Sequence, residues 1–307
     1  MMDRERYQAA FAQVKAPADA AQRALDALPV RQAARRRRLQ KTLALAVTAV
    51  LLMGTAAAEL DNGGVSNLLA PVFGGAQTEL IDAIGYPIGA SCSADGYTVT
   101  ADAVAGDRYN MYIAYTITRD DGQPLPEGVY FEELENSAYR GSGGGYRGPR
   151  SGEDGEVRYV EQWSSEGPVI GRNAEVTMEG LSVYDKETDT HTLLAQGPWT
   201  LKFTLRYKDT TRNVPVAEKS VTDRDGNTYE IQKVQLSALS VRVDMRAPAV
   251  EGGSYPDGFS VALLLKDGST VSPYEHSGGA HGGKEDTVRE SYCIGRFETP
   301  VLLEEVQ

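Results

Sequence analysis

The stretch RRRRLQKTLALAVTAVLLMGTAAAE, Arg35 to Glu59, separates two chemically different parts of the chain. It starts with four arginines and Lys41, and then residues 42–58 carry no charge. A helix needs about 20 mostly apolar residues to cross a bilayer core, with about 17 as the lower limit. Residues 42–58 therefore predict one transmembrane helix.

A cleaved signal peptide is the alternative interpretation of the same run. Ala56-Ala57-Ala58 supplies a small-residue A-x-A cleavage site behind a basic and an apolar region. Against cleavage, 41 residues precede the run, whereas a whole signal peptide usually has about 15–30 residues. Both interpretations stay open, and the uncleaved anchor is the one adopted.

The distribution of charge predicts the orientation of the chain. Residues 1–41 hold ten basic and four acidic residues, a net +6, and residues 59–307 hold 21 basic and 39 acidic residues, a net −18. Basic residues beside a membrane segment stay in the cytoplasm, so the topology signal is Arg35, Arg36, Arg37, Arg38 and Lys41. We expect a single-pass cell-membrane protein with a cytoplasmic N-terminus and an extracytoplasmic C-terminal region. The acidic outer part is not expected to bind nucleic acid, because it would repel phosphate.

Residues 1–41 predict a short cytoplasmic helical segment. Tyr7, Phe11 and Val14 recur at the spacing of one helix face, and Leu25 and Leu28 form a second apolar edge before Pro29. A segment this short does not bury a core of its own. It is either a partner-binding segment, with Tyr7, Phe11, Val14, Leu25 and Leu28 as the binding face, or a tail that precedes the anchor.

Residues 59–90 read as a stalk or packing segment between the membrane and the first outer domain. A short apolar helix is expected at Ser66–Leu69, ended by Pro71, and another at Thr78–Ile84 with Thr78 as its N-cap.

From Tyr97 onward the apolar period changes from helical to alternating. The segment WTLKFTLRY, Trp199 to Tyr207, places Trp199, Leu201, Phe203 and Leu205 on one face of a strand. Many short strands separated by turns favour β-sandwiches, and we predict one over residues 91–212 and a second over 213–307. The Gly-rich segments 141–155 and 277–283 are expected to be surface loops.

The outer part contains two cysteines, Cys92 and Cys293, near its two ends. Outside the cytoplasm they could form a disulfide, and the alternative is two separate thiols that behave as small hydrophobes. The three histidines are His191, His276 and His281, and their spacing is a poor match to a metal site. We predict no catalytic residue, no metal and no cofactor, because no catalytic or phosphate-binding motif occurs.

The layout resembles a family of single-pass bacterial membrane proteins with an extracytoplasmic domain of unknown function, described as anti-sigma factors. YQAAFAQVKAPADAAQRALDAL (Tyr7–Leu28), DGYTVTADAVAGDRYNMYIAYTI (Asp95–Ile117), GPWTLKFTL (Gly197–Leu205) and VQLSALSVRVDM (Val234–Met245) carry the resemblance. It implies a mainly β fold in which a short cytoplasmic helical segment and one transmembrane helix precede two immunoglobulin-like β-sandwich domains. One departure concerns the zinc-binding module of other anti-sigma proteins, which needs His and Cys, whereas residues 1–91 contain neither.

The hypothesis at this point is a non-enzymatic, membrane-anchored regulator. Its N-terminal segment would sequester an extracytoplasmic-function sigma factor, and its outer β region would sense an extracellular ligand. The alternative is a non-enzymatic cell-surface or cell-wall binding module, anchored or secreted.

Overall fold

The computed structural model describes residues 64–139, 144–151, 156–222, 226, 228–248, 261–281 and 288–307, all within one compact unit, residues 47–307. These residues build a mainly β protein with several sheets and three short helices, so the predicted β class is confirmed. None of the described helices has the length and apolar composition needed to cross a bilayer. The predicted spanning run 42–58 lies outside the described residues.

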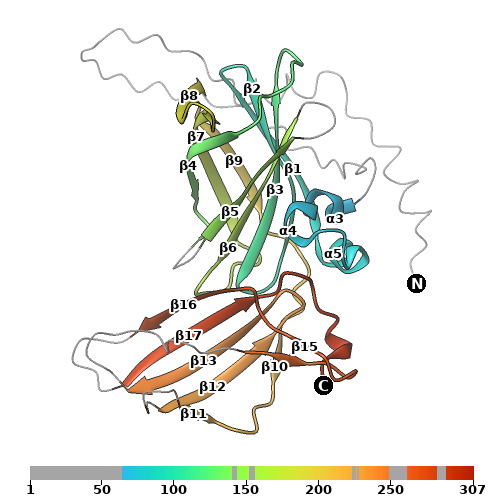
Figure 1. Ribbon diagram of the computed structural model, residues 1–307, viewed down its shortest axis with the longest axis vertical. Coiled ribbons are helices and arrows are strands. Elements are labelled where there is room, and N and C mark those ends of the chain that lie inside the picture. The colour runs from blue at the N-terminus through green and yellow to red at the C-terminus, as the bar shows by residue number, and fades with distance from the viewer. Residues whose placement is uncertain are drawn as a thin grey trace, which may run out of the picture. The chain divides into compact units, whose positions relative to one another are not determined.

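Two sheets form the first β region (Figure 1). The first sheet has the order β1-β2-β3-β6-β5, with β1 Tyr86–Ala94, β2 Tyr97–Gly106, β3 Asn110–Arg119, β6 Val157–Ser164 and β5 Gly144–Ser151. The second sheet has the order β4-β7-β8 with β9 also paired to β7; its strands are β4 Val129–Asn136, β7 Asn173–Asp185, β8 Thr190–Ala195 and β9 Trp199–Thr204. Every strand pair in both sheets is antiparallel.

The core of this region lies between the two sheets. Met111, Ile113 and Tyr115 from β3 and Met178 from β7 belong to the same buried apolar cluster as Trp199. The alternating pattern of WTLKFTLRY is confirmed for Trp199 and Leu201, which are at most 1% exposed while Lys202 is exposed, whereas Phe203 is partly buried and the strand ends at Thr204, before the predicted Tyr207. Alternation of this kind allows one face of a strand to enter a core while the other meets water.

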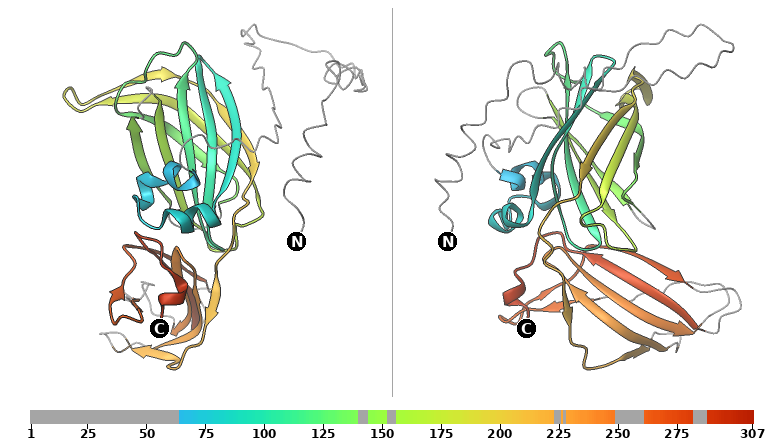
Figure 2. Two further views of the ribbon diagram at one scale, coloured as in Figure 1. Left: turned by 90° about the vertical axis from the view of Figure 1, so that its right-hand side faces the viewer. Right: turned by 180° about the vertical axis from the view of Figure 1, so that it is seen from behind.

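Three helices cover the outer face of the first sheet (Figure 2). They are α3 Gly64–Leu68, α4 Ala70–Phe73 and α5 Thr78–Ile84. Their apolar residues pack on small side chains of β2 and β3 such as Ala103, Ala105 and Ala114. Asp82 links α5 to α3, because its carboxylate accepts hydrogen bonds from the backbone N (2.7 Å) and the hydroxyl (3.1 Å) of Ser66. Residues 59–90 were predicted to be a stalk or a packing segment. The described part, from residue 64, packs on the first sheet and therefore matches the packing segment.

Several local predictions need correction. The helix Thr78–Ile84 has the predicted bounds, but Gln77 occupies the N-cap position, so the prediction of Thr78 as cap is wrong. The helix predicted at Ser66–Leu69 is α3, Gly64–Leu68, and Pro71 does not end it but stands in the first turn of the next helix, α4, where a backbone N–H has no helical acceptor. β1 begins at Tyr86, ahead of the predicted boundary at residue 91.

Two segments predicted as loops are strands at sheet edges. β5, Gly144–Ser151, pairs with β6, and β16, Glu275–His281, pairs with β17. Backbone hydrogen bonds do not depend on the side chain, so Gly-rich segments can add to the edge of a sheet without an alternating apolar pattern. The prediction of loops was therefore wrong for these residues.

The second β region has a six-stranded sheet with the order β10-β12-β13-β17-β16, and β11 also pairs with β12. Its strands are β10 Arg212–Val214, β11 Ser220–Thr222, β12 Thr228–Leu236, β13 Ser240–Pro248, β16 Glu275–His281 and β17 Val288–Arg296. A two-stranded ladder, β14 Leu263–Leu264 with β15 Thr270–Val271, and the C-terminal segment with the 3₁₀ helix η1 Leu303–Glu305 contribute to its core. The central members of that core are Val241, Val243, Met245, Phe297 and Val301.

Candidate functional site

A buried carboxylate lies in the turn that joins β2 to β3. Asp107 is 1% exposed, and its Oδ1 accepts hydrogen bonds from the backbone N of Tyr109 (2.9 Å), the backbone N of Asn110 (2.9 Å) and the Asn110 side-chain amide (2.8 Å). An aspartate readily bonds to the backbone N–H two residues ahead, and this bond shapes the turn. The sequence therefore places Asp107 locally, and the rest of its contacts come from far along the chain.

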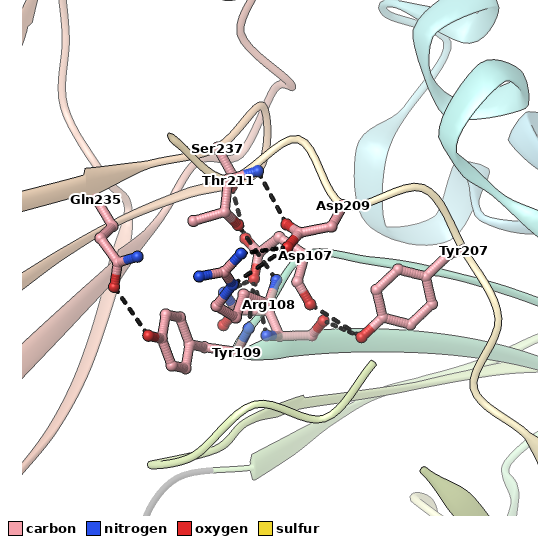
Figure 3. Close-up of polar contacts among 9 residues, drawn as sticks. Asp107, Arg108, Tyr109, Tyr207, Asp209, Thr211, Gln235 and Ser237 are labelled. Carbon is pink, nitrogen blue, oxygen red and sulfur yellow. Dashed lines mark hydrogen bonds and ion pairs between the residues drawn. The ribbon is translucent and has the colours of Figure 1, made fainter. Parts of the chain in front are cut away.

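The second carboxylate oxygen of Asp107 binds the turn between β12 and β13 in the second β region (Figure 3). Its Oδ2 accepts hydrogen bonds from the hydroxyls of Ser237 and Ser240, each at 2.6 Å. The same Ser237 Oγ accepts hydrogen bonds from the backbone N of Leu239 (3.0 Å) and of Ser240 (2.9 Å). Five donors thus surround one carboxylate. Hydrogen bonding of this kind is what stabilises a charge inside a protein.

Tyr207 supports the same turn from the segment that leads out of β9. Its hydroxyl donates to the carbonyl oxygens of Asp107 (2.9 Å) and Asn110 (3.3 Å). Burial raises the pKa of Tyr207 well above its usual value, so the phenol stays a donor at physiological pH. Figure 3 shows Tyr207 on one side of the Asp107 turn, with Ser237 among the labelled residues on the other.

A surface ion pair borders this junction. The Arg108 guanidinium lies 3.2 Å from Asp209 Oδ2, and Asp209 Oδ1 accepts from the backbone N of Thr211 at 2.8 Å. The Arg108 side chain is 39% exposed, and such pairs contribute little to stability. The pair connects the β2–β3 turn to residues 209–211 of the segment that precedes β10.

Tyr109 reaches from the first β region into the second. Its hydroxyl donates to Gln235 Oε1 at 2.8 Å, and its ring packs in a cluster with Tyr292 and Ile294. The Arg242 guanidinium carbon lies 4.1 Å from the ring centroid of Tyr109 and 4.4 Å from that of Tyr292. A cation within about 6 Å of a ring face is attracted by the ring quadrupole. This contact therefore joins one aromatic residue from each region through one charge.

The apex of the β12–β13 turn enters the apolar layer under the helices. Leu239 is fully buried and belongs to the cluster that contains residues of α3, α4 and α5 together with Ala105 and Tyr112. Phe73 of α4 packs against Tyr112 with ring centroids 4.7 Å apart. One leucine of the second region thus contacts the same apolar layer as the helices that precede the first strand.

The chemistry of this junction is structural. Ser237 and Ser240 are hydroxyls that donate to the Asp107 carboxylate, but a catalytic serine must also be open to its substrate. Both serines are at most 4% exposed. The arrangement can hold two β regions together, and nothing in its geometry favours a reaction.

The residues singled out from the sequence fall in other places. The residues Tyr7, Phe11, Val14, Leu25, Leu28, Arg35, Arg36, Arg37, Arg38 and Lys41 lie outside the described part of the chain. Cys92 and Cys293 are free thiols; Cys92 packs on the core of the first region and Cys293 on that of the second. This is the alternative in which the two cysteines act as separate, partly buried hydrophobes.

The residues weighed as metal ligands are also dispersed. His191 is on β8, where its Nδ1 lies 2.6 Å from the Tyr130 hydroxyl, and His276 and His281 are both on β16. Across the described ranges, no group of three or more His, Cys, Asp or Glu is placed to hold a metal ion.

Sequence reasoning missed the Asp107 junction. Asp107 and Ser237 are separated by 130 positions, and neither belongs to a recognisable motif. The sequence signals only the two separate turns, one by an aspartate at its start and the other by the serines on either side of Ala238-Leu239. Neither signal indicates that the two turns meet.

Comparison with known proteins gives a distant structural likeness. No family model matches the chain, and no curated protein matches it. It is similar to the crystal structure of the conserved domain protein from Bacillus anthracis, with 15% sequence identity and a TM-score of 0.49, over 72% of this chain and 74% of that one.

Proposed function

We propose that the chain is a non-enzymatic, membrane-anchored regulator that acts as an anti-sigma factor. Residues 1–41 bind an extracytoplasmic-function sigma factor, and residues 42–58 span the cell membrane. The two β regions, which we take to be immunoglobulin-like, lie outside and respond to an envelope signal.

One observation carries the signalling part of this proposal. Helix α3 begins at Gly64, shortly after the spanning run ends at Ala58, and the helices share one apolar cluster with Leu239 of the second β region. A change in the contacts of Leu239 would therefore reach the segment that leads into the membrane. Coupling through packed side chains requires such a continuous set of contacts.

The cytoplasmic part is supported by the pattern of residues 7–28 and by the charge difference between net +6 inside and net −18 outside. A short segment with an apolar face is suited to folding on a partner. The partner face is Tyr7, Phe11, Val14, Leu25 and Leu28.

A transcription reporter tests this function. Phe11→Asp plus Val14→Asp places two charges on the partner face, and we expect sigma-dependent transcription to rise because the factor is released. Ala9→Asp plus Ala12→Asp adds the same charge on the opposite side of the helix and should leave transcription repressed. Unchanged transcription in the first variant would falsify the assignment.

A cell-surface binding module is the second candidate. A cavity with aromatic walls in the first β region favours it, since such cavities are typical of small-molecule sites. Loss of membrane attachment after processing near Glu59, with no effect of the N-terminal variants, would favour this candidate over the regulator.

A further inference from the structure

A cavity of about 440 Å³ lies beside the end of β4 in the first β region. Its volume falls within the range of about 300–1,000 Å³ that is usual for small-molecule sites. The walls combine two aromatic residues, Tyr139 and Trp163, with two acidic residues, Glu135 and Glu175. It is separate from the Asp107 junction, with which it shares no residue.

The aromatic wall is built from a strand, β6, and from the segment that follows β4. Trp163 is on β6, and Tyr139 follows the end of β4; their ring centroids are 4.2 Å apart with the planes tilted by 46°. On the edge strand β5, the backbone partner of Trp163 is Gly144, a residue without a side chain. Aromatic rings present a negative face, and Trp attracts cations most strongly.

The side chains of Asn136 and Ser137 in the wall are committed to internal hydrogen bonds. The Asn136 amide donates to Glu161 Oε1 at 3.0 Å, and its oxygen accepts from the backbone N of Ala138 at 3.0 Å. The Ser137 hydroxyl oxygen accepts from the backbone N of Glu175 at 2.8 Å. A sugar is recognised through several free donors and acceptors, so these commitments make it a poor match.

The charge around the cavity is negative. Glu135 lies opposite Thr177 on β7, and Glu175 stands two positions before Thr177, so the two glutamates are diagonal neighbours on one face of the sheet. Lys202 Nζ lies 3.1 Å from Glu175 Oε2, but both side chains are more than half exposed, so water screens this pair. Beneath the wall, Glu161 is fully buried and accepts a 2.6 Å hydrogen bond from the Tyr115 hydroxyl, but burial raises its pKa, so it is not counted among the charges of the cavity.

We propose that this cavity binds a compact organic cation, an ammonium or guanidinium group on a short aliphatic chain. The rings of Tyr139 and Trp163 contact the cation and its chain, and the carboxylates of Glu135 and Glu175 balance its charge. The ligand is either a free polyamine or the basic side chain of a peptide, which present the same group. Binding of this cation does not require any particular partner of residues 1–41.

Tryptophan fluorescence of the full-length protein in detergent micelles tests this site. The chain has two tryptophans, and Trp199 is fully buried in the core, so a ligand in the cavity changes the emission of Trp163 alone. The probe is cadaverine, and 1,5-pentanediol is its neutral equivalent of the same length. We expect a saturable change with cadaverine below about 10 mM and at least tenfold weaker binding of the diol.

A lysine tripeptide with blocked ends distinguishes the two sources of the cation. Tighter binding of the tripeptide than of cadaverine assigns a peptide, and weaker binding assigns a free polyamine.

Paired variants separate the site from the general acidity of the protein. Glu135→Gln plus Glu175→Gln should weaken cadaverine binding about tenfold. Glu133→Gln plus Glu179→Gln removes the same charge from an opposed pair on the same two strands, outside the cavity wall, and should weaken it no more than about twofold. Trp163→Phe should abolish the fluorescence change while calorimetry still detects binding.

Three results would overturn the proposal. The first is the absence of a saturable response to cadaverine in protein whose unfolding transition is normal. The second is equal binding of 1,5-pentanediol or of N-acetylglucosamine, which would assign an uncharged ligand. The third is equal weakening by both pairs of glutamate variants, which would mean that the cation only follows the surface charge.

Discussion

The hydroxyl of Ser237 donates a 2.6 Å hydrogen bond to Oδ2 of Asp107, across 130 positions of sequence and between two β regions. Both side chains are at most 2% exposed. A charged acceptor makes such a bond about twice as strong as a neutral one. The Asp107 carboxylate therefore shapes its own turn and binds the neighbouring region at the same time.

Asp107→Asn is expected to destabilise the protein. The substitution replaces an acceptor oxygen with an amide that faces the hydroxyls of Ser237 and Ser240, and leaves buried groups badly matched. We expect a loss of about 2 kcal/mol and a fall in melting temperature of about 4–8 °C. Asp209→Asn, in the surface pair with Arg108, should lose less than about 1 kcal/mol. Equal losses of stability in the two variants would show that Asp107 contributes no more than the surface ion pair does.

Leu239→Ala tests the contact between the second β region and the helices. Leu239 is fully buried, and truncating a buried leucine costs about 2–5 kcal/mol because a cavity remains. We expect faster hydrogen exchange of the amides of α5, because these residues share the cluster with Leu239. Leu264→Ala, at a side chain that is 47% exposed, should change stability by no more than about 0.5 kcal/mol. Unchanged exchange in α5 would contradict the coupling.

Part of this architecture was predictable from the sequence. A pattern within one strand or helix can be read from neighbouring residues, whereas a contact between distant segments cannot. Strand β9 was predictable from its alternation, which is a local signal, whereas β3 is buried at most positions and does not alternate. The edge strands β5 and β16 carry Gly-rich segments whose pairing depends only on backbone groups, so their composition indicated loops. The Asp107–Ser237 contact needs the register of the whole fold, and no local pattern encodes it.

The stability of the protein should depend on the protonation of Asp102. Burial raises its pKa from 3.8 to about 6, against the opposing effect of a 2.7 Å hydrogen bond from Thr116. The folded state therefore binds this proton more tightly than the unfolded state does, and Asp102 removes stability as pH rises from about 4 to about 6. Asp102→Asn should raise stability by about 3 kcal/mol at pH 8 and by almost nothing below pH 4, as measured by melting temperature across this range.

Asp121→Asn supplies a control with the opposite sign. The backbone N–H of Gln123, followed by Arg119, lowers the pKa of this exposed carboxylate. Its charge therefore adds stability above its unfolded pKa, and the variant should not be more stable than the parent at pH 8. A gain at pH 8 in both variants would mean that the net acidity of the protein, rather than the burial of Asp102, is responsible.

Both cysteines should remain thiols. Cys92 and Cys293 pack on different cores, and burial raises the pKa of Cys293, which slows its reaction with oxidants. Protein purified without reductant and then unfolded should react with two equivalents of maleimide, and Cys293→Ser should reduce this to one. Failure of the parent protein to react would show that the two are paired.

The proposed regulator requires one uncleaved chain whose first 41 residues stay inside the cell. The direct measurement uses a tag at each end of the protein, expressed in its host, with membrane fractions blotted before and after protease is added from outside. A membrane-anchored regulator should give one full-length membrane band that loses only its C-terminal tag to the protease. A shorter species that starts near Glu59 and lacks the N-terminal tag would contradict it and would favour the secreted binding module.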